Sequence, residues 1–353
     1  MVPVIGRRAA AVATVVSSLA SLGFGSYTGH WPARPPEVRS LAMVEPPLQA
    51  VAPPVVVASG LFAQNLALDA RGGLWAVSAS AGDSPSAGVS YVPPGGGPVQ
   101  HVHGLAGATA LVWSDNRLYV AGVTKAGEGE VSVLEDFAGD GFAHRHVLLS
   151  GLSSGSHPIG MVSGPDGRLF VGLGALEDHS GPSGRVISLS PGGGAPVLEA
   201  TGLRTAYGLA FWGSRLLFTD NGPDNPGVSP DLLLAFDPSG GVVDFGFPKC
   251  YGQGGSACAA YPKPLVAFPS HSTPEGLVVK DDVAYVAIFG GPNVPGHPAP
   301  RSAIDSINLR TGHVSVFWRS PLPEDLVGLA LGPDGNLYAS GVVSGKVFRF
   351  NLA

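Results

Sequence analysis

Residues 161–174, MVSGPDGRLFVGLG, contain two apolar runs joined by one tight turn. The turn letters GPDG suit a hairpin, because Gly adopts positive φ without steric cost and Pro and Asp favour turn positions. The second run, LFVGL, is apolar without interruption, which is typical of a strand that is buried on both faces. The stretch therefore predicts a β-hairpin inside a larger all-β structure.

The same strand–turn–strand unit recurs along the chain. The other five units are LALDARGGLWAVSAS (66–80), ALVWSDNRLYVAGV (110–123), LAFWGSRLLFTD (209–220), LVVKDDVAYVAIFG (277–290) and LALGPDGNLYASG (329–341). Equivalent positions at Leu74, Leu118, Leu169, Leu216, Ala284 and Leu337 are separated by 44, 51, 47, 68 and 53 residues. Repeats of roughly 40–50 residues with four strands each are typical of propeller blades. Six units predict a six-bladed β-propeller, and a β-sandwich is the alternative because it also has regularly spaced short strands.

The two ends of the repeat region predict how the ring closes. The last unit ends in GKVFRFNLA (345–353) after three strands, and VVVASGL (55–61) can supply the fourth. Such a closure removes an exposed sheet edge. We therefore expect the propeller to cover residues 55–353, with an insertion near 246–268 that accounts for the 68-residue step.

The N-terminal region resembles an export signal. Arg7 and Arg8 precede an apolar stretch from Ala9 to about Gly25, so residues 1–30 are expected to be a signal peptide, with a weak hint of twin-arginine export. Because no clear cleavage site follows, a membrane anchor is the alternative. The Pro-rich residues 31–54 are expected to form a linker. The protein is thus predicted to be exported: secreted, in the cell envelope or periplasmic.

The composition agrees with an exported all-β domain and argues against one class of partner. Hydrophobic residues make up 44% of the chain and charged residues only 13%, while 52 Gly and 33 Pro punctuate the apolar runs. The net charge of −6 leaves no basic footprint, so we expect no nucleic-acid partner. Cys250 and Cys258 lie eight residues apart and are expected to form one local disulfide; a metal site is the alternative.

Three stretches are candidates for chemistry, because loops at one end of a propeller converge on its channel. His157 lies in SGLSSGSHPIG (150–160), just before the innermost strand of the third unit, and Arg204 takes the same place in TGLRTAYGLAF (201–211). The stretch FTDNGPDNPG (218–227) follows the second strand of the fourth unit and is longer than a turn requires. Its many oxygen-bearing residues suit a calcium ion.

At these residues the chain resembles the soluble quinoprotein glucose/sorbosone dehydrogenase family over roughly residues 55–353. The matching pieces are DFAGDGFAHRHVLLSGL, SHPIGMVSGPDGRLFVGLG, GLRTAYGLAFWGSRLLFTDNGPDN, FGFPKCYG and LVGLALGPDGNLYASG. The resemblance implies a six-bladed propeller that binds pyrroloquinoline quinone and calcium. It also implies a sugar or aldehyde substrate and an external electron acceptor.

The resemblance also implies roles for individual residues. His157 matches the general base that takes a proton from the sugar hydroxyl, and Arg204 matches the arginine that lies against the quinone. The remaining implied contacts are Thr205 and Arg301 for the cofactor and Gly222, Pro223 and Asp224 for calcium. Thr205 stands where the family usually has Asn.

Other residues leave two further functions open. Glu324 and Asp325 stand where the family places an arginine, which favours a catalytically silent binding propeller. A calcium-dependent lactonase would need carboxylates and Asn around a metal, and Glu275 and Asp224 are the candidates. His271 is a further candidate channel ligand, in SHSTPEGL (270–277). Basic side chains lining the channel would favour the quinone, and carboxylates would favour the lactonase.

Overall fold

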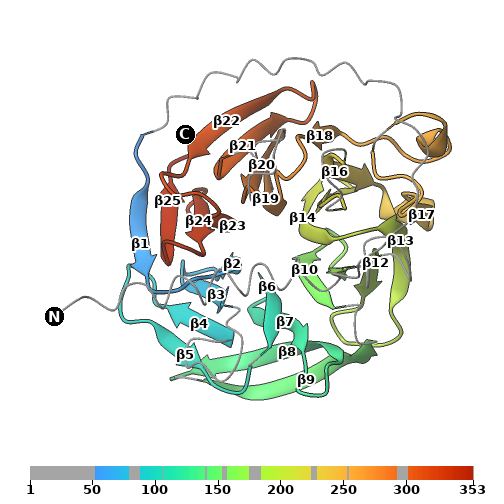
Figure 1. Ribbon diagram of the computed structural model, residues 1–353. Helices are drawn as coiled ribbons and strands as arrows, with labels where there is room; N and C mark the ends of the chain where they lie inside the picture. Colours follow the sequence, from blue (N-terminus) through green and yellow to red (C-terminus); the bar gives the residue numbers. More distant parts are fainter. Residues whose placement is uncertain are drawn as a thin grey trace.

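The structure is a computed structural model that describes residues 52–78, 88–105, 107–139, 141–152, 157–174, 184–223, 229–252, 254–291 and 301–352. These residues form six antiparallel sheets arranged in a ring, as Figure 1 shows. The predicted six-bladed β-propeller is therefore confirmed. The expected signal or anchor and nearly all of the expected linker lie outside the described residues and stay predictions. No helix within the described ranges is long and apolar enough to cross a membrane.

Blades 1 to 3 follow one another along the chain. Blade 1 consists of β2 (Asn65–Leu68), β3 (Leu74–Ser78), β4 (Gly88–Val92) and β5 (Gln100–Val102). Blade 2 consists of β6 (Ala108–Ser114), β7 (Arg117–Val123), β8 (Gly129–Ala138) and β9 (Gly141–Leu152). Blade 3 consists of β10 (Pro158–Ser163), β11 (Leu169–Leu173), β12 (Gly184–Leu189), β13 (Val197–Leu203) and an added strand, β17 (Val243–Asp244).

Blades 4 to 6 complete the ring. Blade 4 consists of β14 (Ala206–Trp212), β15 (Arg215–Asp220), β16 (Asp231–Phe236) and β18 (Val266–Phe268), with short 3-10 helices η1 (Pro238–Gly240) and η2 (Ser256–Cys258) before β18. Blade 5 consists of β19 (Pro274–Lys280), β20 (Val283–Ile288), β21 (Ala303–Asn308) and β22 (Val314–Arg319). Blade 6 consists of β23 (Leu326–Leu331), β24 (Leu337–Gly341), β25 (Lys346–Phe350) and β1 (Val55–Ser59).

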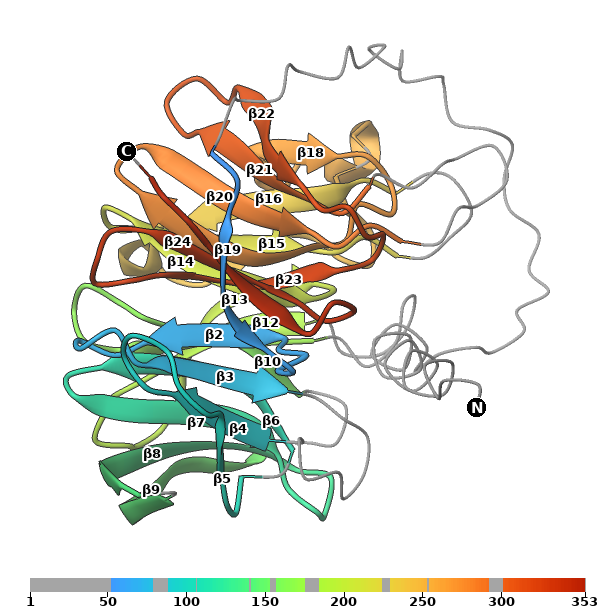
Figure 2. The same ribbon diagram turned by 90° about the vertical axis from the view of Figure 1, so that its left-hand side faces the viewer.

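Strand β1 closes the ring as the sequence predicted. It pairs antiparallel with β25, with Val55 opposite Arg349 and Ser59 opposite Lys346. Figure 2 shows β1 running along the outside of the ring. The N-terminal end of the described chain therefore covers the edge that β25 would otherwise expose.

The core lies between neighbouring blades. The six aligned positions of the repeat are all nearly inaccessible, with exposed fractions of 0–4%: Leu74, Leu118, Leu169, Leu216, Ala284 and Leu337. Strand β11 is buried along its whole length, because both faces of its sheet pack against other blades. This two-sided burial explains why the second strand of each unit reads as an uninterrupted apolar run.

The first strand of each blade, here called the inner strand, faces the centre of the ring in Figure 1. Four of these six strands carry glycine at their third position. At three of them a Cβ atom would overlap the backbone of the next inner strand: Gly160 against Tyr207, Gly208 against Glu275, and Gly276 against Val327. At the fourth, Gly328, it would meet the Ser340 hydroxyl and then the backbone of Gln64 and Asn65. Adjacent inner strands thus approach so closely that a methyl group does not fit.

Hydrogen bonds reinforce the contacts between blades. Thr219 in β15 accepts from the N–H of Gly208 at 2.8 Å and donates to the carbonyl of Glu275 at 3.0 Å, which ties blade 4 to blade 5. Thr109 in β6 donates to the carbonyl of Pro158 at 2.6 Å, which ties blade 2 to blade 3.

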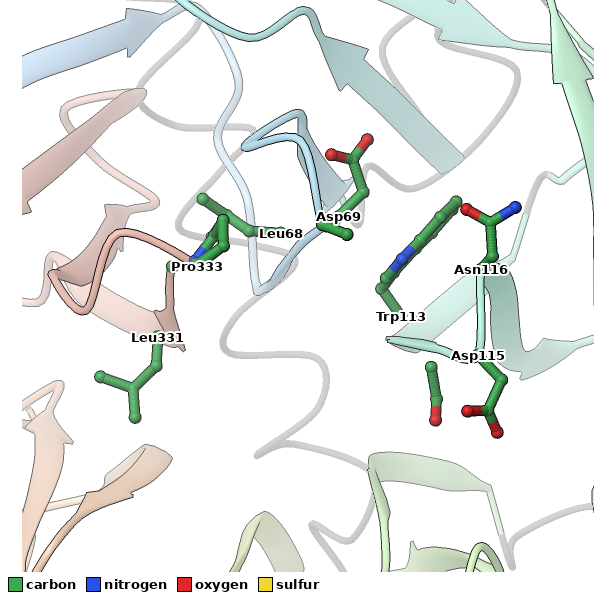
Figure 3. A pocket seen from close by; sticks show the side chains of 10 residues that line it. Leu68, Asp69, Trp113, Asp115, Asn116, Leu331 and Pro333 are labelled. Carbon is green, nitrogen blue, oxygen red and sulfur yellow. The ribbon is translucent and has the colours of Figure 1, made fainter.

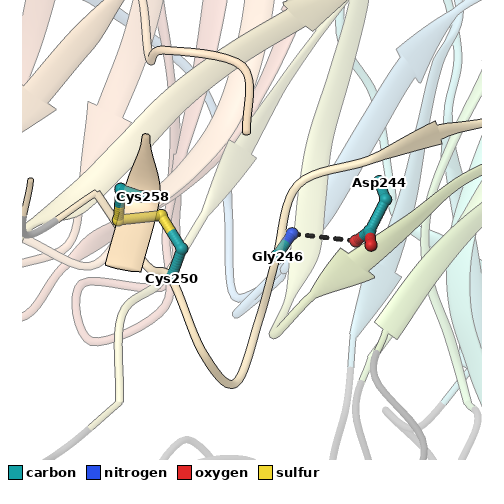
Figure 4. Close-up of a disulfide and its surroundings, with 4 residues drawn as sticks. All are labelled: Asp244, Gly246, Cys250 and Cys258. Atoms are coloured by element: carbon teal, nitrogen blue, oxygen red, sulfur yellow. Dashed lines mark hydrogen bonds between the residues drawn. A yellow bond between two sulfur atoms is a disulfide. The ribbon is translucent and has the colours of Figure 1, made fainter. Parts of the chain in front are cut away.

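The insertion of blade 4 contains the expected disulfide and one unexpected strand. Cys250 and Cys258 are bonded, which confirms the predicted pairing (Figure 4). The segment is more than a local loop, because β17 pairs in parallel with β13 of the neighbouring blade. Asp244 then accepts from the N–H of Gly246 at 2.9 Å, as Figure 4 shows, and turns the chain away from blade 3.

Removal of β1 should destabilise the whole ring. A chain that begins at Phe62 loses a full strand of backbone hydrogen bonds and the partly buried Val57 and Ala58. Its melting temperature should fall by about 10 °C or more, since a loss of several kcal/mol is a large share of typical stability. A chain that begins at Ala52 serves as the control and should melt like the full chain; equal melting of both truncated chains would contradict the closure.

Substitution of an inner-strand glycine should also be costly. Gly208→Ala places a methyl group against the backbone of Glu275, which cannot move without displacing blade 5. We expect a loss of about 1–3 kcal/mol or more in the free energy of unfolding, measured by denaturant titration. Gly240→Ala is the matched control, because its added methyl group meets nothing within 4 Å.

Candidate functional site

The candidate site lies at the end of the channel where the six inner strands begin, here called the entry mouth. His157 directly precedes β10, and Arg204 and Thr205 precede β14. The two segments are joined through Gly174, whose N–H donates to the carbonyl of His157 at 3.2 Å and which forms an isolated bridge with Thr205. The structure thus brings the predicted base and the predicted arginine segment together.

Asp220, the last residue of β15, fixes the backbone before β14. Its carboxylate accepts from the N–H of Arg204 at 3.1 Å and from the N–H of Thr205 at 2.5 Å. Burial raises the pKa of Asp220 to about 6, while these two N–H donors and the charge of Arg204 act in the opposite direction. Thr205 therefore contributes its backbone here.

Asp231, the first residue of β16, holds the stretch that follows β15. One carboxylate oxygen accepts from the N–H of Gly222 at 2.7 Å, and the other accepts from the N–H of Thr273 at 2.8 Å. Blade 4 is thereby tied to the start of blade 5. Burial raises the pKa of this carboxyl to about 6 as well. The stretch 218–223 is therefore an anchored part of the entry mouth.

Glu275 and Asn221 form a buried pair that is only half satisfied. The side-chain amide of Asn221 donates to Oε1 of Glu275 at 3.3 Å. Oε2 of Glu275 and Oδ1 of Asn221 are buried and accept no hydrogen bond from any described residue. Burial raises the pKa of Glu275 to about 8; the Asn221 amide opposes this shift and the nearby Asp231 charge adds to it. Unpaired buried oxygens of this kind require a ligand, an ion or water.

An apolar layer forms the floor of the entry mouth. It consists of buried residues contributed by blades 3 to 6: Ile159, Tyr207, Phe289, Val327 and Val342. The hydroxyl of Tyr207 donates to the carbonyl of Gln64 at 3.2 Å and so links blade 4 to blade 1 across the channel. This floor gives the site an apolar, water-poor base.

The charge balance at the entry mouth is acidic. Arg204 donates from Nη1 to the carbonyl of Asn221 at 3.4 Å. Its charge also opposes the rise in pKa that burial causes in three carboxyls: Asp220, Asp231 and Glu275. At pH 7 the guanidinium is therefore offset by the ionised Asp220 and Asp231. Carboxylates rather than basic side chains surround it, which by the criterion set from the sequence favours a lactonase over an enzyme that binds a trianionic quinone.

His157 is in the neutral form that a general base requires. Its ring is half-buried, and burial lowers its pKa below the usual value, so it is neutral at pH 7. Its Nδ1 atom is buried and has no hydrogen-bond partner among the described residues. A neutral imidazole can accept a proton from a hydroxyl group.

The other candidate residues are more dispersed. His271, at φ 60°, has a buried Nε2 atom that no described residue contacts by hydrogen bonding. Arg301 is exposed and lies before β21, on the same face but farther from the inner strands. Asp325 is a buried loop anchor that accepts from the N–H groups of Val343 and Ser344 at 3.1 and 2.8 Å. Asp224 lies outside the described residues.

The described residues contain no preformed cluster of metal-ligating side chains at the predicted calcium site. No group of three or more His, Cys, Asp or Glu side chains in the described ranges is placed to hold a metal ion. Gly222 and Pro223 directly follow Asn221. Their role as calcium ligands is not tested by the described residues and stays a prediction. Asp231 and Tyr207 were missed from the sequence. Tyr207 could have been identified from the sequence, because it directly precedes an inner-strand glycine in AYGLAF (206–211).

Comparisons with known proteins support the fold. The chain has 20% identity and a TM-score of 0.62 to a Thermus thermophilus protein described as an oxidoreductase (glucose dehydrogenase), covering 85% of this chain and 99% of that one. It has 15% identity and a TM-score of 0.68 to the calcium structure of a Trichoderma reesei carbohydrate-active enzyme of family AA12, covering 88% and 97%. A gluconolactonase from Xanthomonas campestris gives 13% identity and a TM-score of 0.55, covering 88% and 97%.

These structures share the propeller that the sequence resemblance implied. No protein-family model and no curated protein sequence matches the chain. The similar structures include glucose dehydrogenases, in agreement with the resemblance to the quinoprotein glucose/sorbosone dehydrogenases. At these identities the shared feature is the fold, and function must be argued from the site.

The buried Glu275 should make stability depend on pH. Its pKa is about 8 in the folded protein against 4.5 ordinarily, so between these values the folded protein holds a proton that the unfolded chain has released. Stability therefore falls as pH rises through this window, by up to about 1.4 kcal/mol per pH unit for one group. Glu275→Gln, which stays neutral, should flatten the decline when melting is followed from pH 5 to 8 with a chelator present.

The exposed Glu128 provides the control for this experiment. Glu128→Gln removes a carboxylate at the surface and should leave the pH profile of the parent protein unchanged. Parallel profiles for the parent protein and Glu275→Gln would show that Glu275 is ionised in the folded state.

Proposed function

We propose that the protein is an exported, sugar-oxidising dehydrogenase of the glucose dehydrogenase-like type, which acts at the entry mouth and passes electrons to an external acceptor. The observation that carries the proposal is the joining of His157 and the Arg204 segment through Gly174 above an apolar floor. A neutral base and a cation at one site suit oxidation of a sugar carbon that bears a hydroxyl: the base takes the hydroxyl proton, and the hydride on that carbon passes to the external two-electron acceptor.

The two side chains have different tasks in this proposal. His157, kept neutral by burial, accepts the hydroxyl proton of the sugar or aldehyde hydrate. Arg204, held in place by Asp220 through its backbone N–H, stabilises negative charge that develops beside the sugar. The apolar floor excludes water from the reacting carbon, which strengthens both interactions.

The residues fit a calcium ion better than they fit the predicted quinone. The unpaired oxygens of Asn221 and Glu275 are hard donors of the kind that Ca²⁺ prefers, and the carbonyls of Gly222 and Pro223 are the further proposed ligands. A bound cation would keep Glu275 ionised. Pyrroloquinoline quinone carries several carboxylates, whereas Arg204 is already offset at pH 7 by the ionised Asp220 and Asp231, so the described residues do not fit that cofactor and no step is derived through it.

A calcium-dependent lactonase is the second candidate. It is favoured by one observation, the buried Asn221–Glu275 pair with two unpaired oxygens beside Asp231. A cation held there could polarise a lactone carbonyl, and His157 could activate water. The gluconolactonases among the similar structures have the same fold.

A single series of assays tests the proposal. Purified protein is supplied with calcium and a two-electron dye acceptor, in parallel samples with and without pyrroloquinoline quinone, and dye-linked oxidation of a sugar panel is measured beside hydrolysis of sugar lactones. Because the described residues do not fit the quinone, both samples should give the same result. We expect oxidation, and His157→Ala should lower turnover by about 10²–10⁴, the usual contribution of a general base. His313→Ala is the matched control, because His313 is exposed in the turn between β21 and β22.

The remaining results reject the proposal in distinct ways. Calcium-dependent lactone hydrolysis without dye reduction would establish the second candidate. Absence of both activities would favour the third function, a catalytically silent binding propeller, which the acidic Glu324–Asp325 pair suggested in the sequence.

A further inference from the structure

A second concave site lies at the opposite end of the channel, where the inner strands end, here called the exit mouth. A cavity of about 490 Å³ opens there among the first hairpin turns of blades 6, 1 and 2. This volume is within the range of small-molecule sites, roughly 300–1,000 Å³. Figure 3 shows Leu68 and Pro333 on one side of it and Trp113 on the other. The candidate site is at the other end of the same strands, so the two sites are distinct.

Trp113 offers a rigid flat surface to this cavity. The indole is half-buried and stacks on the indole of Trp75, with ring centroids 5.7 Å apart and planes 11° apart. Trp75 is 1% exposed and packs in turn against Tyr91 and Phe137. The orientation of Trp113 is therefore fixed before any ligand binds, which lowers the entropic cost of stacking.

Two polar side chains follow this indole in the same turn. Asp115 and Asn116 form the exposed turn after β6, at φ 50° and 60°, and the charge of Asp115 interacts with that of Arg117. In Figure 3 the amide of Asn116 lies next to Trp113. Asp69, by contrast, already accepts from the N–H groups of Arg71 and Gly73 at 2.9 and 2.8 Å.

The charge of the cavity limits the ligand class. None of the ten residues that line it is basic, so an anionic ligand would find no counter-charge within the lining itself; Arg71 and Arg117 lie just outside it. One carboxylate on an exposed turn gives little affinity for a cation, because water and salt screen it. A flat apolar face combined with an available carboxylate and an available amide instead matches a neutral polyol that has one apolar face.

We propose that the exit mouth is a binding site for a neutral saccharide. The apolar face of a pyranose ring stacks on Trp113, and its hydroxyls bond to the side chains of Asp115 and Asn116. Leu68 and Pro333 line the opposite side of this shallow cavity. This site does not depend on the activity proposed for the entry mouth.

The test follows tryptophan emission of the full chain during titration with maltose, cellobiose and chitobiose, beside the acidic digalacturonate. We expect saturable quenching by at least one neutral disaccharide with a Kd on the order of 1 mM, the range of a shallow site with few contacts. The acidic sugar should bind at least tenfold more weakly. Trp113→Ala should weaken neutral binding tenfold or more. Trp212→Ala is the control, since Trp212 ends β14 on blade 4 and donates to Asp282 at 3.1 Å.

A second variant guards against misfolding of Trp113→Ala. Asn116→Gly removes the amide while glycine keeps the left-handed backbone, so the fold should persist and neutral binding should weaken several-fold. His157→Ala should leave this binding unchanged, which separates failure here from failure at the entry mouth. Absence of saturable quenching by all three neutral sugars, equal binding by Asn116→Gly and the parent protein, or tighter binding of the acidic sugar would overturn the proposal.

Discussion

The close approach of neighbouring inner strands is the constraint on which the rest of the molecule depends. At Gly160, Gly208 and Gly276 the backbone of the next blade occupies the space where a Cβ atom would stand. The strands therefore meet near their first residues, and the channel is narrow enough there for Tyr207 to bond across it to Gln64. Any group placed just before or after these strand starts is brought to one small region.

This narrowness explains the electrostatics of the entry mouth. Carboxylates at the strand ends are removed from water, and each must find a donor or keep its proton. Asp220 and Asp231 find backbone N–H groups and are used to fix loops. Glu275 has only the Asn221 amide, so its pKa rises furthest and one of its oxygens stays unpaired. A ligand can therefore bind at the carboxyl group that receives no hydrogen bond from a backbone N–H, which is Glu275.

The fold could be predicted from the sequence because its determinants are local and repeated. Each hairpin unit contains its own turn residues, and the six nearly inaccessible positions recur at steps of 44 to 53 residues except across the insertion of blade 4. The closing strand was predictable because the last unit lacked a fourth strand. The parallel pairing of β17 with β13 was not, since two residues of strand leave no periodic pattern. Packing between blades decides that contact.

The positions of the candidate residues could be predicted in outline, whereas their contacts could not. His157 and the Arg204 segment are adjacent because each precedes an inner strand, a position that the repeat reveals. The role of Asp231 depends on a contact with Thr273, 42 residues away in another blade, which no local motif encodes. The offsetting of Arg204 by Asp220 and Asp231 likewise follows from contacts in three dimensions rather than from a local motif.

The most direct measurement is a crystal structure of the protein grown with calcium and soaked with a sugar that it oxidises or binds. We expect a cation bound to Oδ1 of Asn221 and Oε2 of Glu275, with the sugar above the apolar floor and a hydroxyl within hydrogen-bond distance of His157. A sugar bound only at the exit mouth, with ordered water between Asn221 and Glu275, would contradict a sugar-converting site at the entry mouth.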